Sequence, residues 1–277
     1  MERPVLKYNG SKWLLTDWIL EHFPAHKVYV DLFGGGGSVL LRKDRARFEY
    51  YNDVDGELCT FFRVLRDRPR ELIRSIRFTA YSRDEFEITR TSTESELETA
   101  RRFYTRCWMN MSNNRAGGSF RSYGNVFSSG GYRPASMFAD LRPLYRAAMR
   151  FRGVVIESKD YGKLLKECSS PETLLFIDPP YLGICRKAGR AYQHEMMSIW
   201  EHFILFLRLR KSPSMIVLCG YPSKLYEITF ERAGWKRVEK RTRDNKRNER
   251  IECLWLNPAC QKALGQQDLF PDFVHAR

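Results

Sequence analysis

The tetrapeptide Asp178-Pro179-Pro180-Tyr181 combines an acid, a stiff backbone and an aromatic ring, and it directly follows the apolar run 174–177. Open α/β sheets carry their chemistry at the carboxyl ends of such buried strands. The carboxylate and a backbone carbonyl can accept the hydrogens of a planar aromatic amine while the tyrosine ring stacks on its face. The prolines restrict the backbone that holds these groups. A simple turn after a strand is the competing interpretation, so the motifs around the tetrapeptide decide between the two.

A second group of residues could hold a nucleoside. Four glycines follow the apolar run that ends at 31–33, and Ser38 then opens a helical pattern. Glycines allow the backbone to pass close to a ligand. The spacing does not fit G-x-G-x-x-G, and no G-K-[ST] is present, which argues against a dinucleotide site or a phosphate loop. Asp53 ends the next predicted strand about 20 residues later, where an acid can bind both hydroxyls of a ribose. Together these residues indicate a nucleoside cofactor without a pyrophosphate.

Apolar runs and helical patterns alternate along the chain, which predicts an α/β fold with a doubly wound, mostly parallel, seven-stranded sheet. The predicted strands lie at 28–33, 48–52, 154–157, 174–177, 215–219, 236–242 and 251–256. The predicted helices lie at 11–22, 55–67, 135–149, 161–167, 195–210 and 222–233. Only a charged loop separates the last two strands, so we expect them to form an antiparallel hairpin at the sheet edge.

About 100 residues separate the second and third predicted strands, far more than the dozen or so that a crossover requires. We therefore predict an inserted subdomain at 57–150, which is helical to about 110 and forms a loop or hairpin at 112–134. The catalytic domain would then comprise 1–56 and 151–258. Residues 259–277 form a C-terminal tail.

The charge balance favours nucleic acid as a partner. Forty-seven Lys and Arg against 33 Asp and Glu give a formal charge of +14, an excess that suits a row of phosphates. The cations gather in the middle of the chain and in the predicted hairpin: Arg101, Arg102, Arg106, Arg115, Arg121, Arg133, Lys240, Arg241, Arg243, Lys246, Arg247 and Arg250.

Other classes of protein are disfavoured. The seven cysteines show no C-x-x-C spacing, so we expect neither a disulfide framework nor a zinc site. No stretch approaches the roughly 20 apolar residues that span a bilayer, and the N-terminus opens no signal-peptide pattern, so the cytoplasm is the expected location.

The order of these motifs resembles that of the Dam-like, alpha-group DNA adenine methyltransferases, especially their phage-encoded branch. The resemblance rests on the segments 7–12, 31–38, 52–55, 159–161 and 178–181, with further similar stretches at 194–196, 220–221 and 252–257. The family places its target-recognition segment between the glycine loop and the tetrapeptide, where this chain has its insertion. The resemblance implies a Rossmann-like methyltransferase that uses S-adenosylmethionine, requires no metal and acts on an adenine flipped out of double-stranded DNA.

The resemblance also implies roles for individual residues. Contacts with S-adenosylmethionine are expected from Tyr8, Lys12, Asp31, Phe33, Gly34, Gly36, Ser38 and Asp53, with Asp160 and Tyr161 at the cofactor's adenine. The reaction centre would be Asp178, Pro179, Pro180 and Tyr181. DNA contacts are expected from Asn113, Arg115, Arg121, Lys240, Arg241, Arg243, Lys246 and Arg247. Asn113 aligns where GATC-reading relatives have an arginine, so the recognition sequence stays open, as does the existence of a partner restriction enzyme.

The tail and two other functions complete the set of hypotheses. Gln266, Leu269 and Phe270 resemble the short peptide by which bacterial DNA enzymes bind the sliding clamp, and packing of Leu269 and Phe270 against the sheet is the alternative. A methyltransferase of RNA or of a protein amide is a second function, and a catalytically inactive DNA-binding regulator is a third. Asp178 and the size of the insertion favour DNA, while the glycines, Asp53 and the tetrapeptide favour an active enzyme.

Overall fold

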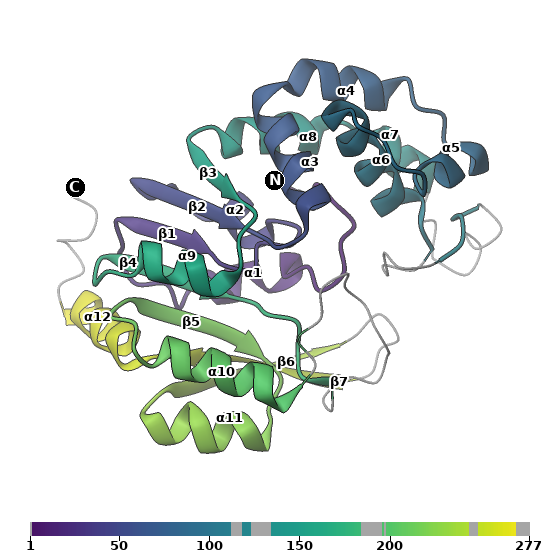
Figure 1. The fold of residues 1–277 in the computed structure, drawn as a ribbon. Coiled ribbons are helices and arrows are strands. Elements are labelled where there is room, and N and C mark those ends of the chain that lie inside the picture. The colour runs from purple at the N-terminus through teal and green to yellow at the C-terminus, as the bar shows by residue number, and fades with distance from the viewer. Residues whose placement is uncertain are drawn as a thin grey trace.

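A computed structural model describes residues 2–111, 118–122, 134–183, 196, 198–243 and 249–269. Its centre is one seven-stranded sheet in the order β3-β2-β1-β4-β5-β7-β6 (Figure 1). The strands are β1 (Val28–Asp31), β2 (Phe48–Asn52), β3 (Val154–Glu157), β4 (Thr173–Ile177), β5 (Met215–Gly220), β6 (Lys236–Arg243) and β7 (Glu249–Leu256). The first five in this order pair in parallel, and β7 runs antiparallel to both β5 and β6. The predicted doubly wound sheet with an antiparallel edge hairpin is thus confirmed.

Helices cover both faces of the sheet, which explains why its central strands are apolar on both sides. In β4, Leu174 and Phe176 belong to one core cluster, and Leu175 and Ile177 belong to the other. The second cluster includes side chains of α9 (Tyr161–Cys168), α10 (Ile199–Leu209) and α11 (Lys224–Thr229), which Figure 1 shows together on the near side of the sheet. The first cluster lies under α1 (Thr16–Leu20), α2 (Ser38–Arg42) and α12 (Pro258–Leu269).

Most of the described chain between β2 and β3 is helical. Its helices are α3 (Gly56–Asp67), α4 (Pro69–Arg77), α5 (Arg83–Ile88), α6 (Glu96–Met109), α7 (Pro134–Ala139) and α8 (Arg142–Phe151). Figure 1 shows α4 to α7 gathered off one end of the sheet, beside β3. Phe62 of α3 stacks on Phe151 of α8 at 4.4 Å, and both rings contact Tyr51 of β2. The insertion therefore shares one continuous core with the sheet.

The segment after α6 begins as a hairpin. Met111 N donates to Ser119 O at 2.9 Å, and Arg121 N donates to Met109 O at 2.7 Å. An antiparallel bridge joins Asn110 to Phe120. These contacts agree with the loop or hairpin predicted at 112–134, of which 112–117 and 123–133 lie outside the described residues.

Several predicted helices differ in their limits. The helix predicted at 11–22 starts as a 3-10 turn at Trp13–Leu15 before α1 begins. The helix predicted at 135–149 is two helices, because Pro143 opens α8 and cannot continue the hydrogen-bonding of α7. The start of α10 moves from 195 to Ile199, where Ser198 and Glu201 form a capping box. The predicted C-terminal tail at 259–277, for which no helix was predicted, starts within helix α12.

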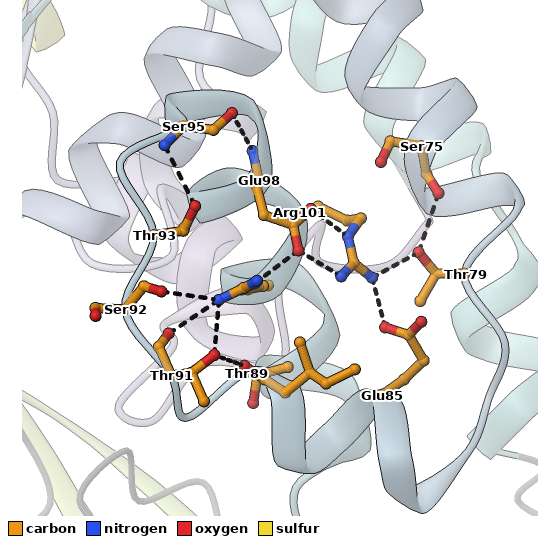
Figure 2. Close-up of polar contacts among 12 residues, drawn as sticks. Ser75, Thr79, Glu85, Thr89, Thr91, Ser92, Thr93, Ser95, Glu98 and Arg101 are labelled. Atoms are coloured by element: carbon orange, nitrogen blue, oxygen red, sulfur yellow. Dashed lines mark hydrogen bonds and ion pairs between the residues drawn. The ribbon is translucent and has the colours of Figure 1, made fainter.

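Part of the cation excess holds the insertion together. Arg101 of α6 is 8% exposed, and its guanidinium binds Glu98 at 2.6 and 2.7 Å, Glu85 at 2.7 Å and Thr79 at 3.0 Å (Figure 2). Arg102 binds Glu98, and Arg106 binds Glu57. These three arginines, which the sequence grouped with nucleic-acid contacts, are engaged within the protein. Within the described residues no helix is long and apolar enough to cross a membrane.

Replacement of the buried arginine tests this role. Arg101→Met should lower the free energy of unfolding by about 2 to 4 kcal/mol, because it leaves the partly buried Glu85 without its cation and Glu98 with Arg102 alone. Urea unfolding followed by circular dichroism measures the change. Arg68→Met is the matched control, because Arg68 pairs with Glu71 on the surface. Equal, small effects of the two substitutions would contradict a structural role for Arg101.

Candidate active site

Four aspartates lie at one edge of the sheet because four parallel strands end there. Asp31 ends β1, Asp53 follows β2, Asp160 follows β3 and Asp178 follows β4. Asp31 is paired in register with Phe176 of β4 and Tyr51 of β2. Asp178 and Asp53 follow these two partners by two residues each, so both acids lie near Asp31. The chain order reverses between β1 and β4, and ligands of doubly wound sheets bind at that switch point.

A cavity of about 370 Å³ opens at this edge. All ten residues predicted to contact the cofactor line it, together with Asp178 and Pro180 of the tetrapeptide. The ten are Tyr8, Lys12, Asp31, Phe33, Gly34, Gly36, Ser38, Asp53, Asp160 and Tyr161. The size is within the usual range for small-molecule sites, which begins at roughly 300 Å³. Pro179 and Tyr181 are next to the cavity but do not line it.

The glycine loop fits closely between its neighbours. A Cβ at Gly34 would come within 2.2 Å of the Tyr51 ring, so this position requires glycine. Gly35 and Gly37 have φ values of +49° and +66°, which side chains rarely adopt. Asp53 accepts a hydrogen bond from Gly35 N at 2.9 Å, and Tyr51 donates to Gly35 O at 2.6 Å. The second strand therefore fixes the shape of the loop.

An aromatic wall closes one side of the cavity. The rings of Phe33 and Tyr161 lie 5.3 Å apart, and the Arg208 guanidinium lies 4.9 Å from the centre of the Tyr161 ring. Arg208 also lies 3.7 Å from Asp160. The sequence had not singled out Arg208, because a lone arginine on a helix carries no signal of the site it faces.

At the other side, Lys12 contacts two residues of the tetrapeptide. Its Nζ lies 2.8 Å from Asp178 Oδ2 and 4.8 Å from the centre of the Tyr181 ring, and the residue is only 8% exposed. Lys12 also donates to Gly10 O at 3.1 Å. The ammonium therefore binds the carboxylate and lies over the ring, the two groups that the sequence predicted for an amine.

The buried acids of the cavity leave carboxylate oxygens available for a cation or a hydrogen-bond donor. Asp178 Oδ1 and Asp31 Oδ1 are buried and have no hydrogen-bond partner within the described residues. Burial raises the pKa of Asp178, and the nearby Lys12 ammonium partly offsets this. Burial raises the pKa of Asp31 well above its usual range, and the charges of Asp178 and Asp53 raise it further. Such a cavity suits a ligand that brings a cation and hydrogen-bond donors.

Two further residues, which the sequence gave no role, surround Tyr181. Its hydroxyl donates to Glu252 Oε2 at 3.0 Å, and its ring meets the Tyr221 ring edge-on at 4.5 Å. Both lie in stretches that carried the family resemblance. That pattern was the one available signal, because neither residue is near 178–181 in the sequence.

The residues predicted to bind DNA are only partly described. The Arg121 guanidinium donates to Asn110 O at 2.7 and 3.1 Å and to Met111 O at 2.9 Å, at the base of the inserted hairpin. Lys240 lies over the Trp18 ring at 5.7 Å, and Arg241 is exposed on β6. Four of the others lie outside the described residues: Asn113, Arg115, Lys246 and Arg247. For Arg243 the structure describes the backbone and not the side chain.

Comparison with known proteins connects this geometry with a family. The family model described as D12 class N6 adenine-specific DNA methyltransferase matches residues 8–242. A DNA adenine methylase of Serratia marcescens is 25% identical over 205 residues, which are 71% of this chain and 74% of that protein. DNA adenine methylases of Vibrio cholerae and Escherichia coli match shorter stretches, at 33% identity over 72 residues and 32% over 75. Those stretches are 26% and 27% of each chain.

The crowded acids lead to a prediction about stability. Asp31→Asn should raise the free energy of unfolding of the ligand-free protein by about 1 kcal/mol at alkaline pH, a typical gain when strain at a binding site is relieved. Because the folded-state pKa of Asp31 is raised above 3.8, the gain should be full above that folded pKa and vanish near pH 3.8. Urea unfolding across this pH range measures the gain in stability. Asp84→Asn, at an exposed residue of α5, is the control. A loss of stability at every pH would show that the Asp31 charge is well compensated.

Proposed function

Because the chain belongs to the family of D12 class N6 adenine-specific DNA methyltransferases, we propose that it transfers a methyl group from S-adenosylmethionine to the exocyclic amine of an adenine in double-stranded DNA. The observation that carries this proposal is the position of Asp178. Its carboxylate lies at the end of β4 and lines the acid-lined cavity, Lys12 contacts both this carboxylate and the Tyr181 ring, and one buried oxygen has no hydrogen-bond partner among the described residues.

The cavity residues fit S-adenosylmethionine. Its sulfonium and ammonium groups are cations, and the raised pKa values of Asp31 and Asp178 mark a place where a cation would relieve repulsion and burial. Asp53 would bind the ribose hydroxyls, and Asp160 with the Phe33 and Tyr161 rings would hold the adenine. The glycine loop would allow close approach of the backbone. When bound, S-adenosylmethionine supplies a methyl group on a positively charged sulfur.

Asp178 and the Pro179 carbonyl would prepare the target amine. The lone pair of an exocyclic amine is delocalised into its ring, so it is a weak nucleophile. Two acceptors on its hydrogens would draw the nitrogen toward tetrahedral geometry and free the lone pair. Holding the amine and the methyl group in line at roughly 3 to 3.5 Å can contribute roughly 7 to 11 kcal/mol to lowering the barrier.

A base within a duplex cannot reach Asp178, so the adenine must rotate out of the helix at a cost of a few kcal/mol. Stacking on Tyr181 would return about 1 to 3 kcal/mol. Lys12 now binds Asp178 Oδ2 and lies over the Tyr181 ring. The incoming base must therefore displace this ammonium from the ring, and its amine can use Oδ1 of Asp178, which has no hydrogen-bond partner in the described part of the chain.

Target recognition would fall to the insertion at 57–150 and to the β6–β7 hairpin. Asn113, Arg115 and Arg121 are our candidates for contacts with base edges. Arg121 would have to exchange its carbonyl partners at the hairpin base for DNA. Lys240, Arg241, Arg243, Lys246 and Arg247 are candidates for phosphate contacts. With a formal charge of +14, binding should weaken steeply as salt is added.

Clamp binding by the tail stays a prediction. Gln266 and Leu269 fall within α12, and Phe270 lies outside the described residues.

Removal of the Asp178 carboxylate tests the proposed reaction. Asp178→Ala should reduce methyl transfer from radiolabelled S-adenosylmethionine to duplex DNA by at least about 100-fold, the usual effect of losing a preorganised polar contact with the reacting group. Circular dichroism should show an unchanged fold. Asp17→Ala, at an exposed acid of α1, is the matched control and should keep full activity.

The methyl-transfer assay, together with measurements of DNA binding and cofactor binding, discriminates the alternatives. Retained activity in Asp178→Ala would exclude the proposed role of this residue. Transfer by the wild-type protein to RNA or protein, but not to duplex DNA, would support the second function. DNA binding without cofactor binding would support a catalytically inactive regulator.

A further inference from the structure

We propose that two residues of β7, Arg250 and Glu252, together with Tyr221, fix the orientation of Tyr181 and link this ring to the edge hairpin. The inference rests on the proposed function, in which Tyr181 receives the flipped base. It assigns positioning roles to three residues that contact Tyr181 directly or through one another and do not line the cofactor cavity.

The first contact is direct. Glu252 Oε2 accepts a hydrogen bond from the Tyr181 hydroxyl at 3.0 Å, and both side chains are half-buried. A tyrosine ring held only at its Cβ can swing about two side-chain torsions. An acceptor at the opposite end of the ring restrains the torsion about Cα–Cβ, because the hydroxyl must stay within hydrogen-bonding distance. Rotation about Cβ–Cγ leaves the hydroxyl in place, so a second contact must restrain the plane of the ring.

The second contact is indirect. The Tyr221 ring meets the Tyr181 ring at 4.5 Å with an interplanar angle of 76°, a favourable edge-to-face arrangement. Tyr221 is itself held, because its hydroxyl accepts a hydrogen bond from Arg250 Nη1 at 2.8 Å. The Tyr181 ring thus packs against a ring whose own position depends on β7.

Arg250 and Glu252 act from the same side of the strand. They are two residues apart in β7, so their side chains point to one face. Tyr221 directly follows Gly220, which pairs with Cys253 of the same strand. One face of β7 therefore supports Tyr181 at two points: directly at the hydroxyl and, through Tyr221, at the ring.

The same strand continues into the proposed DNA-binding hairpin. Glu252 is paired in register with Lys240, and Arg250 with Thr242, directly before the end of β6. Lys240 and Arg241, which would contact phosphates, belong to β6. This strand is paired with β7 at Glu252 and Arg250. Engagement of DNA by the hairpin would steady the residues that orient Tyr181, so that the ring is set when the base arrives.

The contact of Glu252 with Tyr181 makes a specific prediction for catalysis. Glu252→Ala should lower kcat about tenfold, the effect of losing one hydrogen bond, while the KM for DNA changes less than threefold. Tyr181→Phe removes the same bond from the other side and should have a similar effect. The double variant should be no worse than either single variant, because the two changes break one interaction. Glu252→Gln keeps an acceptor and should restore most of kcat.

A second readout follows the base itself. With 2-aminopurine at the mapped target position, the fluorescence change on binding should be altered in Glu252→Ala and in Tyr181→Phe, and near normal in Glu252→Gln. Glu239→Ala is the matched control, because Glu239 is an exposed acid of the same hairpin that pairs with Arg237. It should match the wild type in both assays.

The outcomes separate this inference from the proposed function. If the wild-type protein transfers no methyl group to DNA, the proposed function fails. If the wild type is active and Glu252→Ala equals it, or if the effects of Glu252→Ala and Tyr181→Phe multiply in the double variant, the positioning role is overturned. Thermal unfolding shows whether each variant is folded. If Glu252→Ala does not fold, the comparison of the single variants Glu252→Gln and Tyr181→Phe still decides the question.

Discussion

A largely buried carboxylate at the end of β4 is the constraint on which the site depends. Placing Asp178 there costs free energy unless a cation or hydrogen-bond donors meet it. Lys12 supplies the cation at 2.8 Å, while one oxygen has no hydrogen-bond partner within the residues that the structure describes. The neighbouring Asp31 is a second buried acid, and burial raises its pKa as well. The cavity is therefore arranged for positively charged and hydrogen-donating groups that the protein does not itself provide.

The sheet explains how distant residues reach this carboxylate. Parallel strands β1 to β4 end at one edge, so acids that follow them in the chain become neighbours in space. The antiparallel hairpin then returns β7 beside β5 and brings Glu252 to Tyr181. The described helices of the insertion share a core with the sheet, in which Phe62 stacks on Phe151. Substrate recognition and chemistry would thus be built on one continuous body.

The strands, their mostly parallel arrangement and the edge hairpin could be predicted from the sequence, because apolar runs and the spacing between them are local signals. The strand-end acids followed, since parallel strands end at one edge. What could not be predicted depends on contacts across the chain. The Lys12–Asp178 pair joins residues far apart, and Arg208, Tyr221 and Glu252 carry no local mark of what they face. Arg101 suggested nucleic acid by charge, but burial against Glu85 and Glu98 gives it a structural role. Pro143 divided a predicted helix that apolar periodicity alone had joined.

The most direct test of the central claim is to map modified bases in DNA from a methylation-deficient host that expresses this protein. An exocyclic amine of adenine held by Asp178 predicts N6-methyladenine at a short, defined sequence, and none in cells that express Asp178→Ala. Unmodified adenine with the wild-type protein, or methylation found on cytosine instead, would contradict the account.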